Sequence, residues 1–209
     1  MIIKVCGITN NEDLFRIAGL KPDYLGFIFY PPSPRDVSKK IADLSLNLIP
    51  SEIKKVAVLV DETEENALLL AKKKGFDAIQ LHGNESPDFC KRLKNICRVI
   101  KTFRVKDHLP DQMNLYEGKC DLFLLDTATD KPGGSGKKFD HSVLEGYNLQ
   151  TPYLLSGGIG EEDADYLLDL NQKGMAGVDI NSRFELSPGV KEFLSIERFI
   201  KCLRQNSAG

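Results

Sequence analysis

Residues 55–81, KVAVLVDETEENALLLAKKKGFDAIQL, contain the pattern that decides the fold. The runs at 55–60 and 77–81 are short and almost continuously apolar, as expected of strands that are covered on both faces. The stretch between them predicts a helix, because Thr63 suits the N-cap position and Gly75 stands where a helix C-terminal glycine is favoured. The segment therefore predicts one strand–helix–strand unit of a parallel sheet.

The same unit recurs along the whole chain, at steps of about 20 to 31 residues from strand to strand. Helix-like stretches separate the apolar runs, and Ser86 followed by Pro87 marks the start of one of them. The helical pattern is weaker from Lys39 onward, and no regular helix is predicted over 106–119. The predicted strands are 2–6, 24–29, 55–60, 77–81, 98–103, 122–126, 152–156 and 176–180. The predicted helices are 10–20, 63–75, 86–95, 161–173 and 187–205.

Eight strand-then-helix units without a linker predict one α/β domain over residues 1–209, a single (β/α)8 TIM barrel. A doubly wound open sheet with fewer strands is the structural alternative. The 209 residues are near the lower size limit for a barrel, which leaves no length for a second domain.

Composition narrows the class of protein further. The chain is 42% hydrophobic and 28% charged, and 28 basic against 30 acidic residues argue against a nucleic-acid partner. No apolar run is long enough to span a bilayer, and the amino-terminal MIIKVCGITN does not have the form of a signal peptide. Five cysteines without CxxC or zinc spacing indicate reduced thiols and no metal site. We therefore expect a cytoplasmic protein with no membrane partner.

Active-site residues of such a barrel lie at the carboxyl ends of its strands. Cys6 ends the first predicted strand; it is either a buried structural thiol or a base whose pKa Lys4 and Arg35 could lower. Asp126 ends an otherwise apolar strand; it is either a hydrogen-bonded loop anchor or an acid in a dry pocket. His82 is a proton shuttle, a hydrogen-bonding substrate contact or a structural histidine.

Three loops add candidate binding groups. Arg35, in the proline-stiffened PPSPR, either binds a carboxylate or is a surface arginine. The glycine-rich loop 127–139 is either a lid or a mobile surface loop, and its glycines are Gly133, Gly134 and Gly136. Backbone groups after the seventh and eighth strands favour a phosphorylated small-molecule ligand, and the residues concerned are Gly157, Gly158, Asn181 and Ser182.

Six segments together resemble the phosphoribosylanthranilate isomerase family, in the family's order and across nearly the whole chain. They are KVCGIT at 4–9, GFIFYPPSPR at 26–35, AIQLHGNE at 78–85, LLD with GGSGKKFD within 124–140, LLSGGI at 154–159 and GVDINSRFELSPGVKE at 177–192. The resemblance implies a (β/α)8 barrel that performs an Amadori rearrangement of N-(5-phosphoribosyl)anthranilate without a cofactor.

The resemblance also implies roles for individual residues. Asp126 matches the general acid that opens the ribose ring, and Cys6 matches the general base that removes the proton from ribose C2. Arg35 matches the residue that holds the anthranilate carboxylate, and Asp179 matches a polar position near the substrate. The sequence departs from the family at Arg183, where a glycine is usual; this side chain could restrict the backbone or add charge near the phosphate.

Two other functions remain to be weighed. Indole-3-glycerol-phosphate synthase, another phosphate-binding barrel, would need a lysine acid and a glutamate partner at strand ends, and these are absent from the predicted positions. A barrel that merely binds a ligand or scaffolds a complex would not need both Cys6 and Asp126. The family pattern is compatible with a monomer, which we expect, and with a homodimer.

Overall fold

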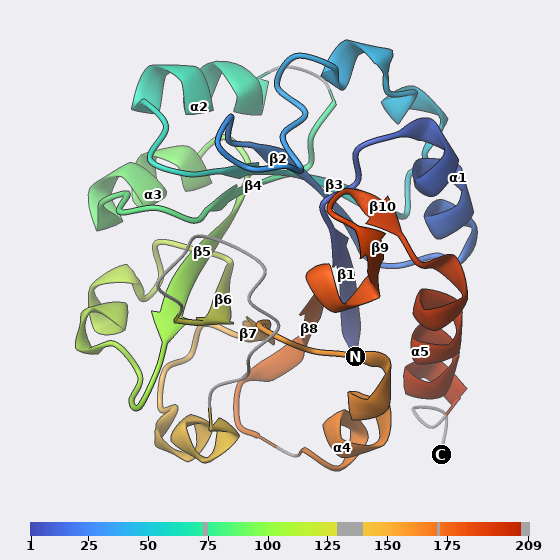
Figure 1. Cartoon of the computed structure of the whole chain (residues 1–209). Coiled ribbons are helices and arrows are strands. Elements are labelled where there is room, and N and C mark those ends of the chain that lie inside the picture. Colours follow the sequence, from blue (N-terminus) through green and yellow to red (C-terminus); the bar gives the residue numbers. More distant parts are fainter. Residues whose placement is uncertain (73–74, 129–139, 171, 206–209) are drawn as a thin grey trace.

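The computed structural model describes residues 1–72, 75–128, 140–170 and 172–205. Its eight main strands are parallel, each pairs with the next, and β8 pairs with β1 to close a barrel (Figure 1). Closure of the sheet excludes the doubly wound alternative and confirms the barrel. The strands are β1 (Ile2–Cys6), β2 (Tyr24–Phe29), β3 (Lys54–Leu59), β4 (Ala78–Leu81), β5 (Arg98–Val105), β6 (Leu122–Thr127), β7 (Tyr153–Leu155) and β8 (Met175–Ile180).

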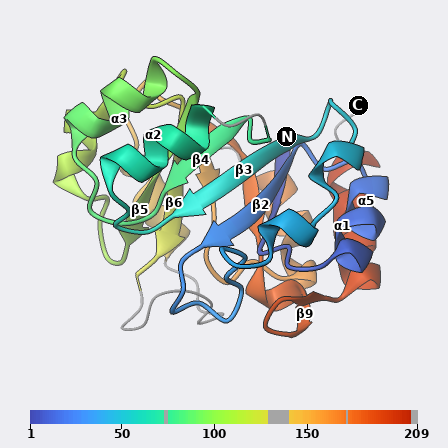
Figure 2. The same ribbon diagram turned by 90° about the horizontal axis from the view of Figure 1, so that it is seen from above.

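Helices cover the outside of the barrel, with α2 beside α3 on one side and α1 beside α5 on the other (Figures 1 and 2). The connections after β2, β5 and β6 contain 3-10 turns in their described parts rather than α-helices. This agrees with the weak helical pattern after Lys39 and with the absence of a predicted helix over 106–119. The helices are α1 (Asn11–Gly19), α2 (Glu64–Lys72), α3 (Pro87–Lys94), α4 (Ala164–Asp169) and α5 (Phe193–Gln205).

Side-chain caps determine where two of these helices begin. The Asn10 side chain accepts a hydrogen bond from the Asp13 N–H at 2.8 Å and caps α1. Ser86 accepts from the Phe89 N–H at 3.2 Å and caps α3, with Pro87 in the first turn as predicted.

The prediction of one helix over 187–205 is wrong in its first part. Residues Glu185–Ser187 and Val190–Lys191 form a two-stranded antiparallel hairpin, β9–β10, and α5 begins only at Phe193. The turn contains Gly189 at a φ of 84°, which a helix cannot accommodate. The predicted helix 161–173 is likewise shorter, because it starts as a 3-10 turn and α4 ends at Asp169.

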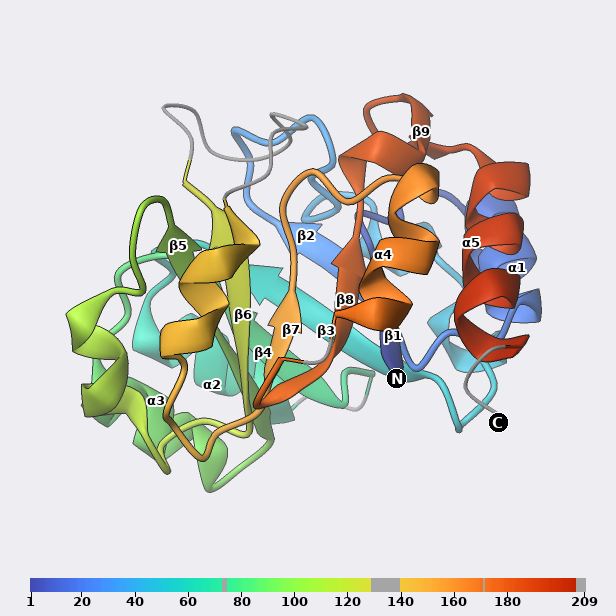
Figure 3. The ribbon, with the colours of Figure 1, turned by 90° about the horizontal axis from the view of Figure 1, so that it is seen from below.

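The barrel interior is filled below its carboxyl ends. Tyr24 and Arg98, the first residues of β2 and β5, are joined by a hydrogen bond of 2.7 Å, and apolar side chains occupy the middle. Figure 3 shows the β9–β10 hairpin at the end of the barrel opposite the amino terminus. In the part of the chain described, no helix has the length and apolarity to cross a membrane.

Candidate active site

One cavity of about 430 Å³ opens at the carboxyl ends of the strands. Every predicted site residue that the structure describes lines it, although these residues come from six separate segments of the chain. They are Cys6, Arg35, His82, Asp126, Gly157, Gly158, Asp179, Asn181 and Ser182. The predicted lid glycines, Gly133, Gly134 and Gly136, lie outside the described residues.

Cys6 ends β1 and is 4% exposed. It faces Gly26 of β2, where an added Cβ would lie 2.6 Å from the Cys6 Sγ, so the missing side chain is what leaves room for the thiol. Burial raises the pKa of Cys6, and the charges of Lys4 and Lys191 act in the opposite direction. Lys4 therefore favours the thiolate as the sequence predicts, and Lys191 is a further cation that the sequence does not indicate.

Beneath Cys6 lies a buried ion pair between β1 and β8. The Lys4 Nζ is 2.8 Å from the Asp179 Oδ1, and the two residues are 0% and 6% exposed. Burial alone would lower the pKa of Lys4, but the charges of Asp179 and Cys6 outweigh burial and raise it. Asp179 therefore lines the cavity and also holds the ammonium of Lys4 next to the thiol.

Asp126 and His82 form a second polar pair. The Asp126 Oδ2 is 3.5 Å from the His82 Nε2, and the Asp126 Oδ1 accepts a hydrogen bond from the Thr127 N–H at 3.0 Å. The Gln80 Nε2 lies 3.2 Å from the His82 Nδ1, so Gln80 helps to hold the imidazole with its Nε2 toward Asp126. Gln80 was missed in the sequence, although it is two residues before His82 on the same strand face.

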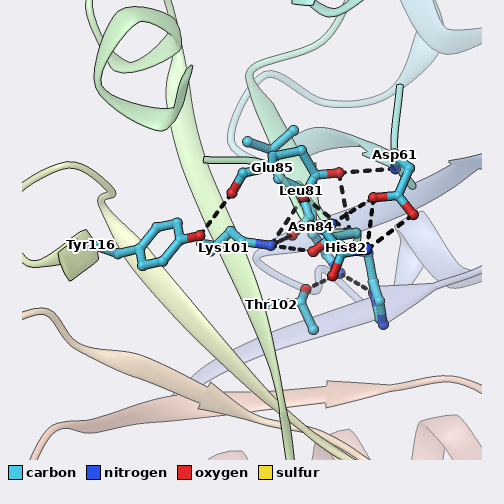
Figure 4. Close-up of polar contacts among 10 residues, drawn as sticks. Asp61, Leu81, His82, Asn84, Glu85, Lys101, Thr102 and Tyr116 are labelled. Atoms are coloured by element: carbon cyan, nitrogen blue, oxygen red, sulfur yellow. Dashed lines mark hydrogen bonds and ion pairs between the residues drawn. The ribbon is translucent and has the colours of Figure 1, made fainter. Parts of the chain in front are cut away.

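A hydrogen-bonded network fixes the loop that carries His82 (Figure 4). The buried Lys101 donates to the Glu85 Oε2 at 3.0 Å and to the Gly83 carbonyl at 2.7 Å. Asp61 accepts from the Asn84 N–H at 2.6 Å, which ties the loop after β3 to the same segment. The loop is therefore anchored on two sides, and the position of the imidazole is largely fixed.

Arg35 is 8% exposed, so its interpretation as a surface arginine is wrong. Its Nε lies 3.0 Å from both carboxylate oxygens of Glu185, and its Nη2 lies 2.5 Å from the Glu185 Oε2. Glu185 also accepts from the Lys191 Nζ at 2.9 Å. Glu185 and Lys191 both belong to the hairpin segment. The sequence does not indicate them as site residues, because it predicts a helix over 187–205, which contains Lys191, and a loop before it, which contains Glu185.

The end of the cavity next to the loops after β7 and β8 is lined mainly by backbone groups. Gly157 has a φ of 91°, and a Cβ there would lie 2.2 Å from the Thr127 Oγ1, so only glycine fits. Among the described residues, the N–H groups of Gly157, Gly158 and Ser182 have no acceptor, and the buried Thr127 Oγ1 has no partner. Unpaired donors in a cavity are the usual form of an anion site.

Arg183, at the position where the resemblance implies a glycine, does not disturb this end of the cavity. Its φ is not positive, so the side chain does not strain the backbone. Its guanidinium pairs with Glu162 and is 42% exposed. The guanidinium therefore points toward Glu162. It does not add charge near the proposed phosphate end, which was one of the two effects that the sequence allowed.

A closed barrel with a polar cavity at the carboxyl ends of its strands defines a (β/α)8-barrel enzyme. The family model described as N-(5'-phosphoribosyl)anthranilate (PRA) isomerase matches residues 3–202. A relative with this name from Phocaeicola vulgatus is 41% identical over 98% of both chains, and another from Thermotoga neapolitana is 39% identical over 95% of this chain and 96% of its own. The chain belongs to the N-(5'-phosphoribosyl)anthranilate isomerase family.

Solved structures agree with this assignment. Phosphoribosyl anthranilate isomerase from Thermotoga maritima superimposes with a TM-score of 0.85 at 34% identity, over 98% of this chain and 100% of that one. A structure of the isomerase in complex with reduced 1-(o-carboxyphenylamino)-1-deoxyribulose 5-phosphate gives 0.80 at 30% identity, with the same coverage.

Proposed function

We propose that Asp126 and Cys6 are the general acid and general base with which this cavity performs the family's reaction. The chain is an isomerase that converts N-(5-phosphoribosyl)anthranilate to 1-(2-carboxyphenylamino)-1-deoxyribulose 5-phosphate in tryptophan biosynthesis. The observation that carries the proposed roles is that the thiol and the carboxyl line one cavity, from different strands. This rearrangement needs one acid and one base within reach of a single sugar.

The proposed steps balance with these two groups. Asp126 gives its proton to the ribose ring oxygen, the C1–O bond breaks, and the nitrogen lone pair forms a protonated imine. The Cys6 thiolate then removes the C2 proton, and the C2–H electron pair moves toward the imine to give an enolamine. The enolamine tautomerises to the ketone. The imine itself accepts the electrons, so the steps need no cofactor.

The remaining lining groups suit the two anionic ends of the substrate. The free N–H groups of Gly157, Gly158 and Ser182, with the turn at Asn181, support a phosphate subsite at that end of the cavity. Arg35 uses one edge of its guanidinium for Glu185, and its Nη1 has no acceptor within the described residues. We assign that free edge to the anthranilate carboxylate.

His82 and Asp179 are proposed as contacts to the sugar between these two ends. His82 directs its Nε2 toward Asp126, so it lies beside the proposed acid, and Asp179 lies beside the proposed base through Lys4. Both line the cavity.

We further propose a monomeric, cytoplasmic enzyme that folds as one domain over residues 1–209. The exposed apolar side chains support a monomer, because they are distributed over several elements; examples are Phe15, Leu69, Leu115 and Leu186. One solved relative, from Thermotoga maritima, is described as dimeric. Light scattering on the purified protein decides between 23.3 kDa and twice that mass.

The catalytic roles are tested by following the loss of anthranilate fluorescence when phosphoribosylanthranilate is supplied. Cys6→Ala and Asp126→Ala should each lower kcat at least about 100-fold, the usual contribution of a general acid or base, with the fold intact. Cys97→Ala is a matched control, because Cys97 is partly exposed and does not line the cavity. A near-normal kcat in either active-site variant would remove that residue from its role.

A further inference from the structure

Lys191 is a buried cation that the steps above do not use. It lies in β10, is 3% exposed, and donates to the Asn181 Oδ1 at 2.8 Å and to the Glu185 Oε1 at 2.9 Å. An ammonium has three donors, and no third hydrogen bond from its Nζ is found among the described residues. Burying a charged lysine costs free energy, so a buried lysine at this site indicates that its charge has a function there.

Lys191 lies close to the peptide that follows Cys6. A Cβ added at Gly7 would be 2.7 Å from the Asn181 Oδ1, the same oxygen that accepts from the Lys191 Nζ. The β9–β10 hairpin therefore brings a cation against the end of β1, across about 185 residues of sequence.

Among the buried side chains around Cys6, cations outnumber carboxylates. Lys4 is matched by Asp179, and the single carboxylate of Glu185 is shared by Arg35 and Lys191. Lys4, Arg35 and Lys191 thus share two buried carboxylates, and this excess of positive charge favours a negative charge on Cys6. The thiolate of Cys6 supplies that charge.

We propose that Lys191 is the residue that stabilises the thiolate form of Cys6, as an electrostatic positioning group of the reaction. This rests on the proposed function in one respect only, namely that Cys6 is the base. Lys191 keeps its proton throughout, while Cys6 alternates between thiolate and thiol as it takes the C2 proton and returns it.

The pKa directions are consistent with such a pair. Burial lowers the pKa of Lys191, Arg35 adds to the lowering, and Glu185 and Cys6 oppose it. Burial raises the pKa of Cys6, and Lys191 opposes that rise. The ammonium of Lys191 and the thiolate of Cys6 therefore stabilise each other. Glu185, the carboxylate that pairs with Lys191, is also paired with Arg35.

The other charged groups around the cavity remain in place in the test. Those that line it are Asp179 on β8, Arg35 after β2, His82 after β4, Arg104 on β5 and Asp126 on β6. Lys4 on β1 and Glu185 on β9 lie behind the lining, paired with Asp179 and Arg35.

The experiment measures the alkylation rate of Cys6 by iodoacetamide against pH, read at the Cys6 peptide by mass spectrometry. In Lys191→Met the pH midpoint should rise by about one unit, which is about a tenfold slower alkylation at a fixed pH below the midpoint. The acid limb of kcat should move in the same direction. Lys191→Arg retains the charge and should restore the midpoint substantially.

Lys101→Met is the matched control, because Lys101 is 2% exposed and paired with Glu85 but does not line the cavity that holds Cys6. Its Cys6 midpoint should equal that of the unaltered protein. If Lys191→Met does not fold, Lys191→Gln gives the same comparison, since its amide can still hydrogen-bond Glu185.

An unchanged midpoint in the uncharged variants, or an equal rise in Lys191→Arg, would overturn the inference. The alkylation readout needs no turnover, so it separates this inference from the catalytic role of Cys6. If Cys6→Ala retained activity while Lys191→Met raised the midpoint, the role of Cys6 would fail and the coupling would stand.

Discussion

The position of a single thiol depends on a residue that has no side chain. Gly26 of β2 pairs with Cys6 of β1, and a Cβ there would lie 2.6 Å from the Sγ, closer than any real contact of that kind. Its φ is not positive, so the local backbone suits alanine, and the added Cβ would collide with Cys6, mainly with its Sγ and also with its Cα at 3.1 Å. The glycine thereby determines where the proposed base can lie.

Gly26→Ala should therefore lower kcat about 100-fold, because displacing a reacting group by about 1 Å costs that much. Fluorescence kinetics measure the effect, and circular dichroism checks the fold. Gly19→Ala, at a helix end with nothing within 4 Å of the added Cβ, should leave kcat unchanged. Normal turnover in Gly26→Ala would show that the thiol can move without consequence.

At this scale the sequence predicts the lining residues well and their partners poorly. Cys6 ends β1 and Asp126 is the last residue but one of β6, so the apolar runs before them mark both positions, although the pattern alone leaves a structural thiol and a loop anchor open. The partner of Arg35 could not, because Glu185 is 150 residues away and no periodicity links the two. Buried ion pairs depend on closure of the barrel, which brings distant loops together.

Among the elements, the β9–β10 hairpin departs most from its predicted form. The residues after Gly189 have a helical pattern that continues into α5, and the pattern gives no reason to begin the helix at Phe193. The hairpin is instead held by long-range contacts. The Thr9 hydroxyl donates to the Gly189 carbonyl at 2.6 Å, and the Lys191 N–H donates to the Asp13 Oδ2 at 3.0 Å. Tertiary contacts thus override the local helical preference.

Glu185 should be the main electrostatic anchor of this hairpin. Burial alone would raise the pKa of Glu185, but its hydrogen bonds and charge interactions with Arg35 and Lys191 outweigh burial and lower it. A carboxyl whose folded-state pKa is lowered stabilises the fold above its unfolded value, about 4.3, and this stability is lost as the pH falls through the folded pKa.

Glu185→Gln should accordingly lower the free energy of unfolding by about 3 kcal/mol at pH 7, since it leaves two buried cations without their carboxylate. Urea denaturation measures it, and the difference from the unaltered protein should shrink below about pH 4 as Glu185 itself becomes protonated. Glu162→Gln removes an exposed partner of Arg183 and should cost less than about 1 kcal/mol. A pH-independent difference would mean that Glu185 acts through packing.

For the molecule as a whole, the repeat of strands predicts the closed barrel and the cavity at its carboxyl ends, because apolar runs of regular spacing leave few alternatives. The 3-10 connections after β2, β5 and β6 are harder to predict, since a few turns can cover a strand as well as a helix does. The cavity follows from closure: all eight strands end at one rim, so polar residues scattered over the sequence meet there.

Binding at that rim should stabilise the entire barrel. At 100 times its Kd, the reduced product 1-(o-carboxyphenylamino)-1-deoxyribulose 5-phosphate should add about 2.7 kcal/mol, which raises the Tm of a chain of this length by about 5–10 °C. Differential scanning fluorimetry measures the rise.

Gly157→Ala should abolish most of that rise, because the added Cβ collides with the Thr127 Oγ1 and displaces the N–H groups proposed to hold the phosphate. Gly118→Ala is the matched control: its φ of 71° imposes the same kind of backbone strain, but nothing lies within 4 Å of the added Cβ. Both variants should have a lower Tm than the unaltered protein in the absence of ligand. Only Gly118→Ala should show the full rise in Tm when the ligand is added. An equal increment in Gly157→Ala would place the phosphate elsewhere on the rim, since strain alone lowers the starting Tm without altering the affinity.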